Sequence, residues 1–274
     1  MLGGCGIFAS RCFLASIVSL AALGLSSAQA QDSGNLAQEA QNPIANLISV
    51  PFQNNTNFNV GPRNGTQNVL NIQPVIPLSL SPEWNLITRT ILPILTQPGF
   101  LPGQSSTTGR GDLQFSAFLS PSNAAGLIWG AGPIVQAPTN TSERLGNDRW
   151  GLGPTAVALH LEKGSPWVYG ALVNNVWSVG SGGDPSYNNF LLQPFINYNL
   201  PGGTYINSAP IITANWKAES GQKWIVPLGL GMGHIFHLGR LPLNAQIGGY
   251  YNVIRPDDDP DWQLRLQVHF MFPK

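Results

Sequence analysis

The sequence predicts an all-β protein, an antiparallel up-and-down transmembrane β-barrel of about 12 strands. Three observations predict it: segments in which apolar and polar residues alternate, links that are short and long in turn, and a low charge content of 9% with 31 glycines and 23 prolines. Alternation with period two is typical of a strand that has one apolar and one polar face. In a membrane barrel the apolar face contacts lipid and the polar face lines the interior.

The last segment, Trp262–Phe272, shows this alternation most clearly. Its apolar row is Trp262, Leu264, Leu266, Val268, Phe270 and Phe272, and between these stand Gln263, Arg265, Gln267, His269 and Met271. Aromatic residues mark both ends of the apolar row, as they do at membrane interfaces. A closing strand that ends in an aromatic residue is typical of outer-membrane barrels, although here Pro273 and Lys274 follow. We expect the outer-membrane assembly machinery to engage this strand.

The N-terminal residues 1–30 are predicted to be a signal peptide. Arg11 precedes an apolar run that is too short to span a membrane comfortably, and an Ala-x-Ala site ends at Ala30. Both cysteines of the chain would leave with this segment. Residues 31–49 are predicted to be a periplasmic N-terminal segment, in which Asn42-Pro43 indicates a cap followed by a single turn. Residues 50–274 are predicted to form the outer-membrane β-barrel.

The candidate strands have the length of a tilted bilayer crossing. They are residues 50–60, 66–80, 84–96, 111–119, 126–138, 150–161, 167–178, 187–199, 204–216, 224–235, 241–253 and 262–272. After the first hairpin, at residues 61–65, tight turns rich in Gly, Pro and Ser alternate strictly with longer polar links. An up-and-down barrel with short periplasmic turns and longer outer loops predicts this order, and it puts both chain ends in the periplasm.

Two soluble architectures compete with this interpretation. A β-sandwich with Greek-key links would break the alternation of link lengths, and a lipocalin-like barrel usually has fewer strands. Prolines inside candidate strands need an explanation in each case, because proline cannot donate to a ladder. They are Pro74, Pro77, Pro93, Pro133, Pro154, Pro194, Pro210 and Pro227. We expect them at β-bulges that bend the wall.

The polar rows of the strands supply candidate lumen residues, among which amides outnumber charges. These are Arg89, His160, Asn197, Asn215, Gln246, Arg265, Gln267 and His269. Such a lining favours neutral or weakly polar solutes. Arg89 and Arg265 are the sharpest candidates, because an arginine facing lipid would cost about 2–4 kcal/mol at the bilayer midplane. Alternatively, each arginine pairs with a carboxylate such as Asp112 and only makes the interior rigid.

Signals for other chemistry are weak. The four histidines show no metal-ligand spacing, and Asp257–Asp261 fits a solvated loop tip or a cation patch without the glycine of a calcium loop. Lipid hydrolysis would need Ser208 or Ser116 beside His160 or His269, but no Gly-x-Ser-x-Gly elbow is present. We therefore expect no enzyme, no cofactor and no metal, and the net charge of zero indicates no nucleic-acid partner.

Three stretches resemble a bacterial outer-membrane family catalogued under the MetA-pathway of phenol degradation, some of whose members carry the label neuromedin U. They are Val50–Asn55, Asn71–Pro77 and Trp262–Val268. The resemblance covers nearly all of the chain after residue 30, and it implies an outer-membrane barrel with a transport role. It names no site residues. The suggestion of aromatic or hydrophobic solutes comes from the family name and not from these residues.

The predicted function is a channel that passes small solutes, aromatic or hydrophobic ones included, by diffusion through an amide-lined lumen. Residues 97–109 and 139–148 are candidate gates, and the expected partners are outer-membrane lipids and the solutes themselves. Three alternatives stay open: a structural or plugged barrel without transport, a lipid-modifying enzyme of the outer membrane, and a soluble periplasmic binding barrel.

Overall fold

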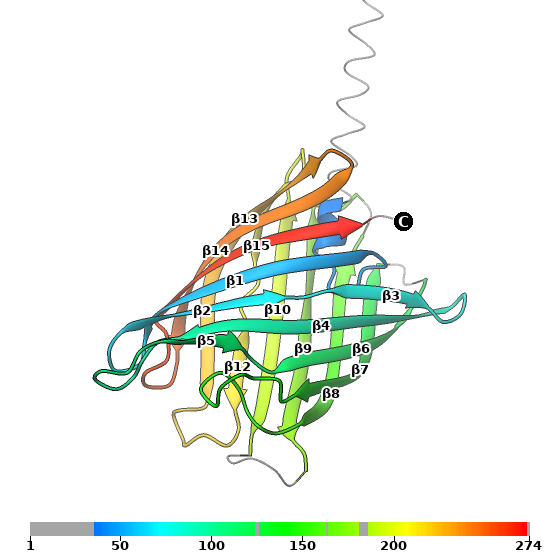
Figure 1. The fold of residues 1–274 in the computed structure, drawn as a ribbon. Coiled ribbons are helices and arrows are strands. Elements are labelled where there is room, and N and C mark those ends of the chain that lie inside the picture. The colour runs from blue at the N-terminus through cyan, green and yellow to red at the C-terminus, as the bar shows by residue number, and fades with distance from the viewer. Residues whose placement is uncertain (1–35, 124–125, 163, 181–185, 273–274) are drawn as a thin grey trace, which may run out of the picture.

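The computed structural model describes residues 36–123, 126–162, 164–180 and 186–272, and these form one closed antiparallel β-barrel (Figure 1). The strands are β1 (Ile48–Val60), β2 (Gly65–Ile72), β3 (Val75–Ser79), β4 (Trp84–Gln97), β5 (Thr107–Arg110), β6 (Leu113–Pro121), β7 (Leu127–Ala137), β8 (Gly151–Leu161), β9 (Trp167–Ser178), β10 (Asn188–Asn199), β11 (Thr204–Ser208), β12 (Ile212–Asn215), β13 (Trp224–Leu238), β14 (Leu241–Ile254) and β15 (Trp262–Phe272). No helix among these residues is long and apolar enough to cross a membrane.

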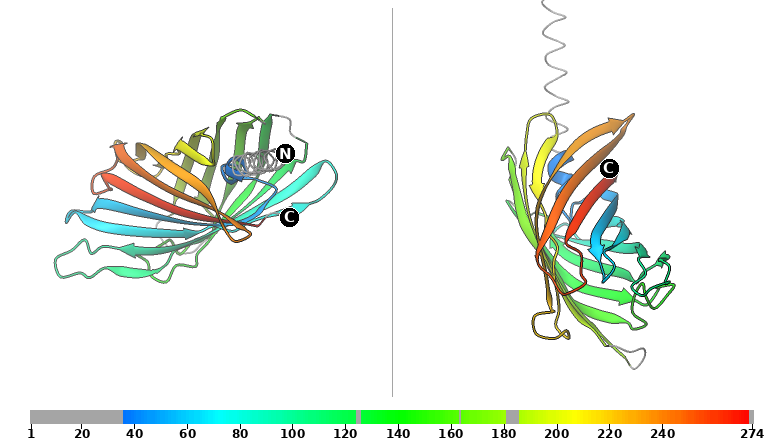
Figure 2. Two further views of the ribbon diagram at one scale, coloured as in Figure 1. Left: turned by 90° about the horizontal axis from the view of Figure 1, so that it is seen from above. Right: turned by 90° about the vertical axis from the view of Figure 1, so that its left-hand side faces the viewer.

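The ring closes because β1 pairs with β15 as well as with β2. Three strands of the wall are each divided in two, as β2 and β3, β5 and β6, and β11 and β12, so that the described chain builds a wall of twelve strands. The fold class predicted from the sequence is therefore confirmed. Viewed from above, the ring encloses the helical turn of residues 36–40 (Figure 2).

The alternation of faces is realised as predicted. On β15, Trp262, Leu264, Leu266, Val268 and Phe272 are exposed on the outer face, whereas Arg265, His269 and Met271 on the inner face are at most 6% exposed. Large apolar side chains are likewise exposed on the outer faces of β1, β3, β6 to β11, β13 and β14. Exposure of so many large apolar side chains to water is unfavourable, whereas lipid would cover them.

Aromatic pairs border this apolar surface at both ends of the barrel. Near the short turns lie the contacts Trp84–Trp129 and Trp167–Tyr198, and near the long loops lie Phe190–Trp216, Trp216–Trp224 and Tyr251–Trp262. Aromatic side chains with a polar group favour the interface between lipid and water. The two sets therefore mark the two interfaces of a membrane-spanning wall.

The first hairpin has a short link, residues 61–64, and after it the links sort by length as the sequence predicts. Residues 80–83, 122–126, 162–166, 200–203 and 239–240 are the short turns, and residues 98–106, 138–150, 179–187, 216–223 and 255–261 are the longer loops at the opposite end. We call the two ends the turn end and the loop end. The described chain starts and finishes at the turn end (Figure 1).

Three of the eight prolines, Pro77, Pro93 and Pro194, lie within β3, β4 and β10, and the other five divide into three groups. Pro74 and Pro210 lie in the breaks that separate β2 from β3 and β11 from β12, so the predicted continuous strands 66–80 and 204–216 are wrong. Pro227 lies at a register shift in the β13–β14 ladder, as expected for a bulge. Pro133 and Pro154 face each other within the β7–β8 ladder, whose register does not shift, so the bulge expected at these two positions is wrong. Each of these is preceded by a glycine, which lets the neighbouring backbone approach closely.

The segment before β1 turns into the ring instead of away from it. Residues 36–40 form a helical turn, and a second turn follows in which the backbone N–H of Ala45 donates to Asn42 O (3.2 Å). The Asn42 side chain accepts from the Ile44 N–H at 3.0 Å, as a capping asparagine does. The single turn predicted after Asn42 is present, but no helix continues to residue 48.

Candidate functional site

Residues 36–47, which we call the N-terminal segment, pack against the inner face of the barrel. Ala37, Ala45 and Leu47 are buried against Tyr205, Ile235 and Met271 of the wall. Ile44 is only 3% exposed and inserts into a second apolar cluster, formed by inward side chains of β3, β4, β6, β8, β9 and β10. The interior near the turn end is thus filled on two sides by apolar packing.

Polar contacts fix the same segment to the short turns. The Gln38 amide donates to Ser165 O at 2.8 Å, and Gln41 and Asn199 exchange amide hydrogen bonds of 2.8 and 3.2 Å. Ser165 lies in the turn between β8 and β9, and Asn199 ends β10. The segment therefore obstructs the lumen at the turn end, and it does so with contacts that can be broken without unpairing a strand.

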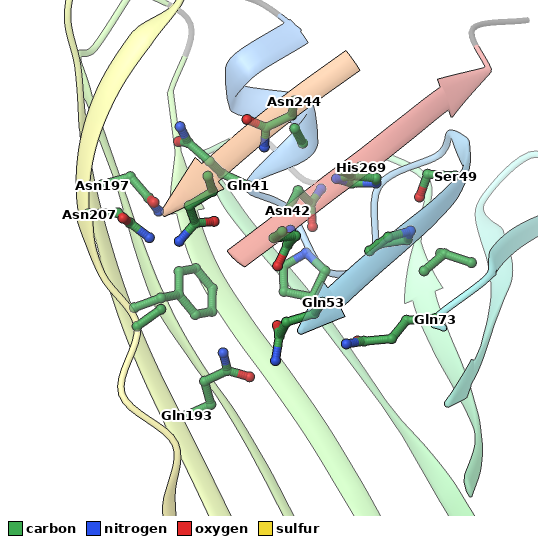
Figure 3. A pocket seen from close by; sticks show the side chains of 18 of the residues that line it. Gln41, Asn42, Ser49, Gln53, Gln73, Gln193, Asn197, Asn207, Asn244 and His269 are labelled. Carbon is green, nitrogen blue, oxygen red and sulfur yellow. The ribbon is translucent and has the colours of Figure 1, made fainter. Parts of the chain in front are cut away.

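Between the N-terminal segment and the wall lies a cavity of about 130 Å³, which we call the inner cavity. Most of its lining residues are polar, and their side chains come from several strands (Figure 3). The polar side chains are Gln41, Asn42, Ser49, Gln53, Gln73, Arg89, Gln193, Asn197, Tyr205, Asn207, Asn244, Gln246, Arg265, Gln267 and His269.

Arg265 lines the inner cavity and joins several polar groups of the wall. It is 2% exposed, and its Nε, Nη1 and Nη2 atoms donate to Asn55 Oδ1, Ala209 O and Gln263 Oε1 at 3.1, 2.8 and 3.0 Å. Its guanidinium also lies 4.5 Å from the centre of the Tyr250 ring. Because Ala209 belongs to the break between β11 and β12, the side chain joins β15 to a distant part of the wall.

A chain of amides continues from Arg265 toward the loop end. Gln263 donates to Asn57, Asn57 to Gln67, and Gln67 to Gln97, with distances of 3.0, 2.7 and 2.6 Å. These residues lie on β15, β1, β2 and β4, which are neighbours in the ring. Gln263, Asn57 and Gln67 each use both the N–H and the C=O of the side-chain amide, and Gln97 ends the row as an acceptor, so these four amides form a continuous hydrogen-bonded row with no formal charge.

Arg89 does not pair with Asp112, so that alternative is wrong. Arg89 Nη2 donates to Gln73 Oε1, whereas the Asp112 carboxylate accepts from Asn147 N at 2.6 Å and from the side chain of Gln136 at 3.2 Å. Within the described part of the chain, neither Arg89 nor Arg265 forms an ion pair with a carboxylate.

The other candidate residues have three different surroundings. Asn197, Gln246, Gln267 and His269 line the inner cavity, and Asn215 lies on the rim of a loop-end hollow. The expected lumen position of His160 is wrong. Its ring packs against Tyr169 on the outer face and lies 3.7 Å from Glu162, because inward residues of β8 have odd numbers. Polar side chains near a turn can face outward at a membrane interface, so polarity alone gave the wrong face.

The loop end is held together by two charged residues. Arg144 donates to Thr107 Oγ1 (2.6 Å) and Ser105 O (3.2 Å), which ties residues 139–148 to residues 97–109. The Asp112 carboxylate also holds residues 139–148, because it accepts a hydrogen bond from the backbone N–H of Asn147. Burial, and then the nearby Asp112 carboxylate, raise the pKa of Tyr187 to about 12. This hydroxyl stays protonated and donates to Arg149 O at 3.2 Å. The hydrogen bonds of Arg144 therefore connect the two candidate gates to each other.

The acidic loop and the serine–histidine pairs were the other candidates for chemistry. Asp261 pairs with Arg255 and accepts from Asn59, and Asp257 accepts from Gln222 at 2.9 Å. Among the described residues, no three His, Cys, Asp or Glu side chains gather to hold a metal ion. The Ser208 hydroxyl donates to Gly229 O (2.7 Å), and neither ring nitrogen of His269 has a hydrogen-bond partner among the residues that the structure describes. No serine is therefore activated by His269.

The sequence did not identify the residues that close the inner cavity. Gln53 and Gln73 occupy polar rows and could have been found from the period-two pattern. Gln41 and Asn42 could not, because they belong to a segment without periodicity and reach the cavity only through the reversal of the chain before β1.

The fold and its interior define a transmembrane-type β-barrel with a polar lumen, and comparison with solved structures agrees with this class. An outer membrane channel of the group COG4313 from Pseudomonas putida F1 is similar with 20% identity, 84% of this chain and 97% of that chain covered, and a TM-score of 0.62. The NanC porin has 8% identity, coverage of 83% and 100%, and a TM-score of 0.51. At these identities the likeness concerns the fold. No family model matches the chain, and no curated protein matches it. The family resemblance of the sequence thus remains a prediction.

Proposed function

We propose that the protein is an outer-membrane channel for small, weakly polar solutes, closed at its turn end by the N-terminal segment. The observation that carries this proposal is the row of hydrogen-bonded amides on the inner wall near the loop end, together with the mostly polar residues that line the inner cavity. A barrel that needed only to be stable could fill its interior with apolar packing, as this one does beside Ile44. An amide-lined path can exchange hydrogen bonds with a passing solute.

Passage requires displacement of the N-terminal segment. Residues 36–47 are held by three side-chain hydrogen bonds and by apolar contacts, and they belong to no strand before Ile48. The outer candidate gates, residues 97–109 and 139–148, are tied together instead. We therefore assign the gating role to the N-terminal segment. The same proposal includes a cleaved signal peptide, a turn end that faces the periplasm, and a location in the outer membrane.

A second candidate is a closed barrel that transports nothing. It is favoured by the burial of Ile44, Ala37 and Leu47, which would be lost each time the segment left the lumen. A lipid-hydrolysing role has no comparable support, since His160 lies on the outer face. Aromatic or hydrophobic solutes rest on the family resemblance alone, because the path between Gln97 and Arg265 is polar.

Conductance measurements separate the candidates. We expect the predicted mature chain, residues 31–274, refolded into planar bilayers, to show small and intermittent currents, and residues 48–274 to show larger and steadier ones. Heat-modifiable migration on gels verifies that both chains fold. Absence of current from both folded chains would contradict the channel and support the closed barrel. Equal currents from both would contradict gating by the N-terminal segment.

A further inference from the structure

The inner cavity carries positive charge without a balancing acid in its lining. Arg89 from β4 and Arg265 from β15 both line it, and its other polar side chains are amides, one serine, one tyrosine and one histidine. No Asp or Glu is among the lining residues. Two guanidinium groups stay charged in proteins, so they favour a negatively charged partner. We propose that the inner cavity binds a small carboxylate anion.

Arg89 has donors available for such a ligand. A guanidinium has five N–H groups, and within the described part of the chain only one of them, on Nη2, has a protein acceptor, Gln73 Oε1. Arg265 has already committed three nitrogens to the wall. Arg89 is therefore the residue that holds the carboxylate, and Arg265 adds the field of its charge from β15, which is separated from β4 in the ring by β1 and by the divided strand of β2 and β3. A planar guanidinium can bind a carboxylate through two parallel hydrogen bonds.

Two buried polar groups beside the cavity also lack partners. Within the described ranges of the chain, both ring nitrogens of His269 and the Oδ1 atom of Asn207 make no hydrogen bond, although these side chains are only 6% and 5% exposed. Figure 3 shows both side chains in the lining. Buried polar atoms nearly always have a partner, which can be protein, water or ligand. A ring N–H of His269 can donate to a carboxylate oxygen, which gives the ligand a second anchor on another strand.

The volume limits the size of the ligand. A water molecule takes up about 30 Å³, and an apolar cavity of about 150 Å³ accommodates benzene. The inner cavity, at about 130 Å³, therefore suits a short aliphatic carboxylate such as propionate while the N-terminal segment is seated. Gln41 and Asn42 of that segment also line the cavity. A bound anion thus contacts segment and wall together and stabilises the seated segment.

Binding can be tested without measuring transport. Propionate and its neutral isostere propionamide are titrated into residues 31–274 in detergent, with calorimetry or ligand-observed NMR as the readout. We expect saturable binding of propionate, at least about tenfold tighter than that of propionamide, because a charge-assisted hydrogen bond is lost with the charge. Arg89→Gln should weaken propionate binding about tenfold or more, and Arg89→Lys should restore part of it.

Arg63→Gln is the matched control. Arg63 is an exposed arginine in the link between β1 and β2, and its substitution should leave propionate binding unchanged. If Arg89→Gln fails the heat-modifiability check, His269→Gln replaces it and should weaken propionate binding as well. Equal affinity for acid and amide, no saturable binding, or unchanged binding after the Arg89 substitution would overturn the proposal. Stabilisation of the seated segment by the anion rests on the proposed channel, whereas binding of the anion does not. Propionate binding without any current would contradict the channel. Current without propionate binding would contradict the anion site.

Discussion

Arg265 shows how a single buried charge organises the interior. Its three donors satisfy acceptors on β1, on β15 and in the break between β11 and β12, and no carboxylate takes part. Buried charges need such complete hydrogen bonding, because removal from water is costly. The residue therefore links distant parts of the wall, and its contribution to stability should be larger than that of any exposed arginine of the chain.

Replacement of Arg265 by methionine should reduce the free energy of unfolding by about 3 kcal/mol. The substitution removes the donors that Arg265 supplies to Gln263 Oε1 and Ala209 O, and it leaves Asn55 Oδ1 with only the Gln53 amide at 3.4 Å. Urea titration of the refolded barrel, followed by tryptophan fluorescence, measures the effect. Arg63→Met serves as the control and should change stability by less than about 0.5 kcal/mol. An equally small effect of Arg265→Met would show that the interior network is not structural.

Asp259 gives a prediction with a defined dependence on pH. Burial, and to a smaller extent the neighbouring Asp258, raise the pKa of Asp259, and Arg255 opposes them. A carboxyl whose pKa is higher in the folded state contributes stability at acidic pH and loses it as pH rises through that pKa. Asp259→Asn should therefore stabilise the barrel at pH 7, and its advantage should disappear toward pH 3.

Unfolding midpoints of wild type and Asp259→Asn across this pH range test the sign. The control is Glu143→Gln, a substitution of an exposed carboxylate in the loop between β7 and β8, which should show no such trend. A variant that is less stable than wild type at pH 7 would mean that the charged form of Asp259 supports the loop end.

At the scale of elements, the β7–β8 hairpin places two Gly-Pro steps opposite each other on neighbouring strands. Pro133 opposes Pro154, Gly132 opposes Thr155, and Gly153 opposes Ile134. The outer ladders of the hairpin are interrupted at the same level, because the prolines have no N–H to donate to β6 or β9. A side chain at Gly132 would place its Cβ 1.8 Å from Ala117 O, and one at Gly153 would place it 1.7 Å from Asn175 O.

Gly132→Ala and Gly153→Ala should each impair folding, because the atoms in the way are backbone. We expect a lower yield of the heat-modifiable form and a loss of stability of about 2–4 kcal/mol. Gly249→Ala in β14 is the control, since no atom lies within 4 Å of the added Cβ. Wild-type folding of both hairpin variants would mean that the strands can separate at this level at little cost.

The N-terminal segment permits a direct test of gating. Residues 31–274 contain no cysteine, so Gln41→Cys with Asn199→Cys introduces the only thiols. The native side chains form hydrogen bonds with each other, and a short cleavable bis-thiol reagent should therefore connect the two positions. We expect the cross-link to abolish current and its cleavage to restore it. A matched pair at Arg63 and Asn199 should not cross-link, because Arg63 belongs to the loop end. Undiminished current after complete cross-linking would exclude the segment as the gate.

The sequence could predict most strands, because lipid on one side and polar groups on the other impose a strict period of two. It could not predict the breaks in three of them. Pro74 and Pro210 fall in two of these breaks, yet Pro133, Pro154 and Pro194 look the same in sequence and lie within strands. Whether a proline ends pairing depends on its neighbours in the ring, and these are set by register rather than by local sequence.

For the whole molecule, the barrel and the direction of its faces followed from the sequence, and the contents of its lumen did not. Arg265 and His269 could be placed inside because their row alternates with an apolar one. His160 could not, since the row it belongs to on β8 is less regular and ends near a turn. The closure of the turn end depends on contacts between residues more than 100 positions apart, such as Gln38 with Ser165, which no local pattern encodes.

The account depends most on lipid lying outside the β-wall and polar surroundings inside it. A series of single cysteines along β15, from Gln263 to Phe270 in residues 31–274, each labelled with an environment-sensitive fluorophore in lipid vesicles, measures this directly. We predict blue-shifted emission, quenched by a lipid-phase quencher, at positions 264, 266 and 268, and the absence of such quenching at positions 263, 265 and 267. Emission that did not alternate along the strand would contradict the account. Quenching of the labels at 264, 266 and 268 only by a water-soluble quencher would contradict it as well.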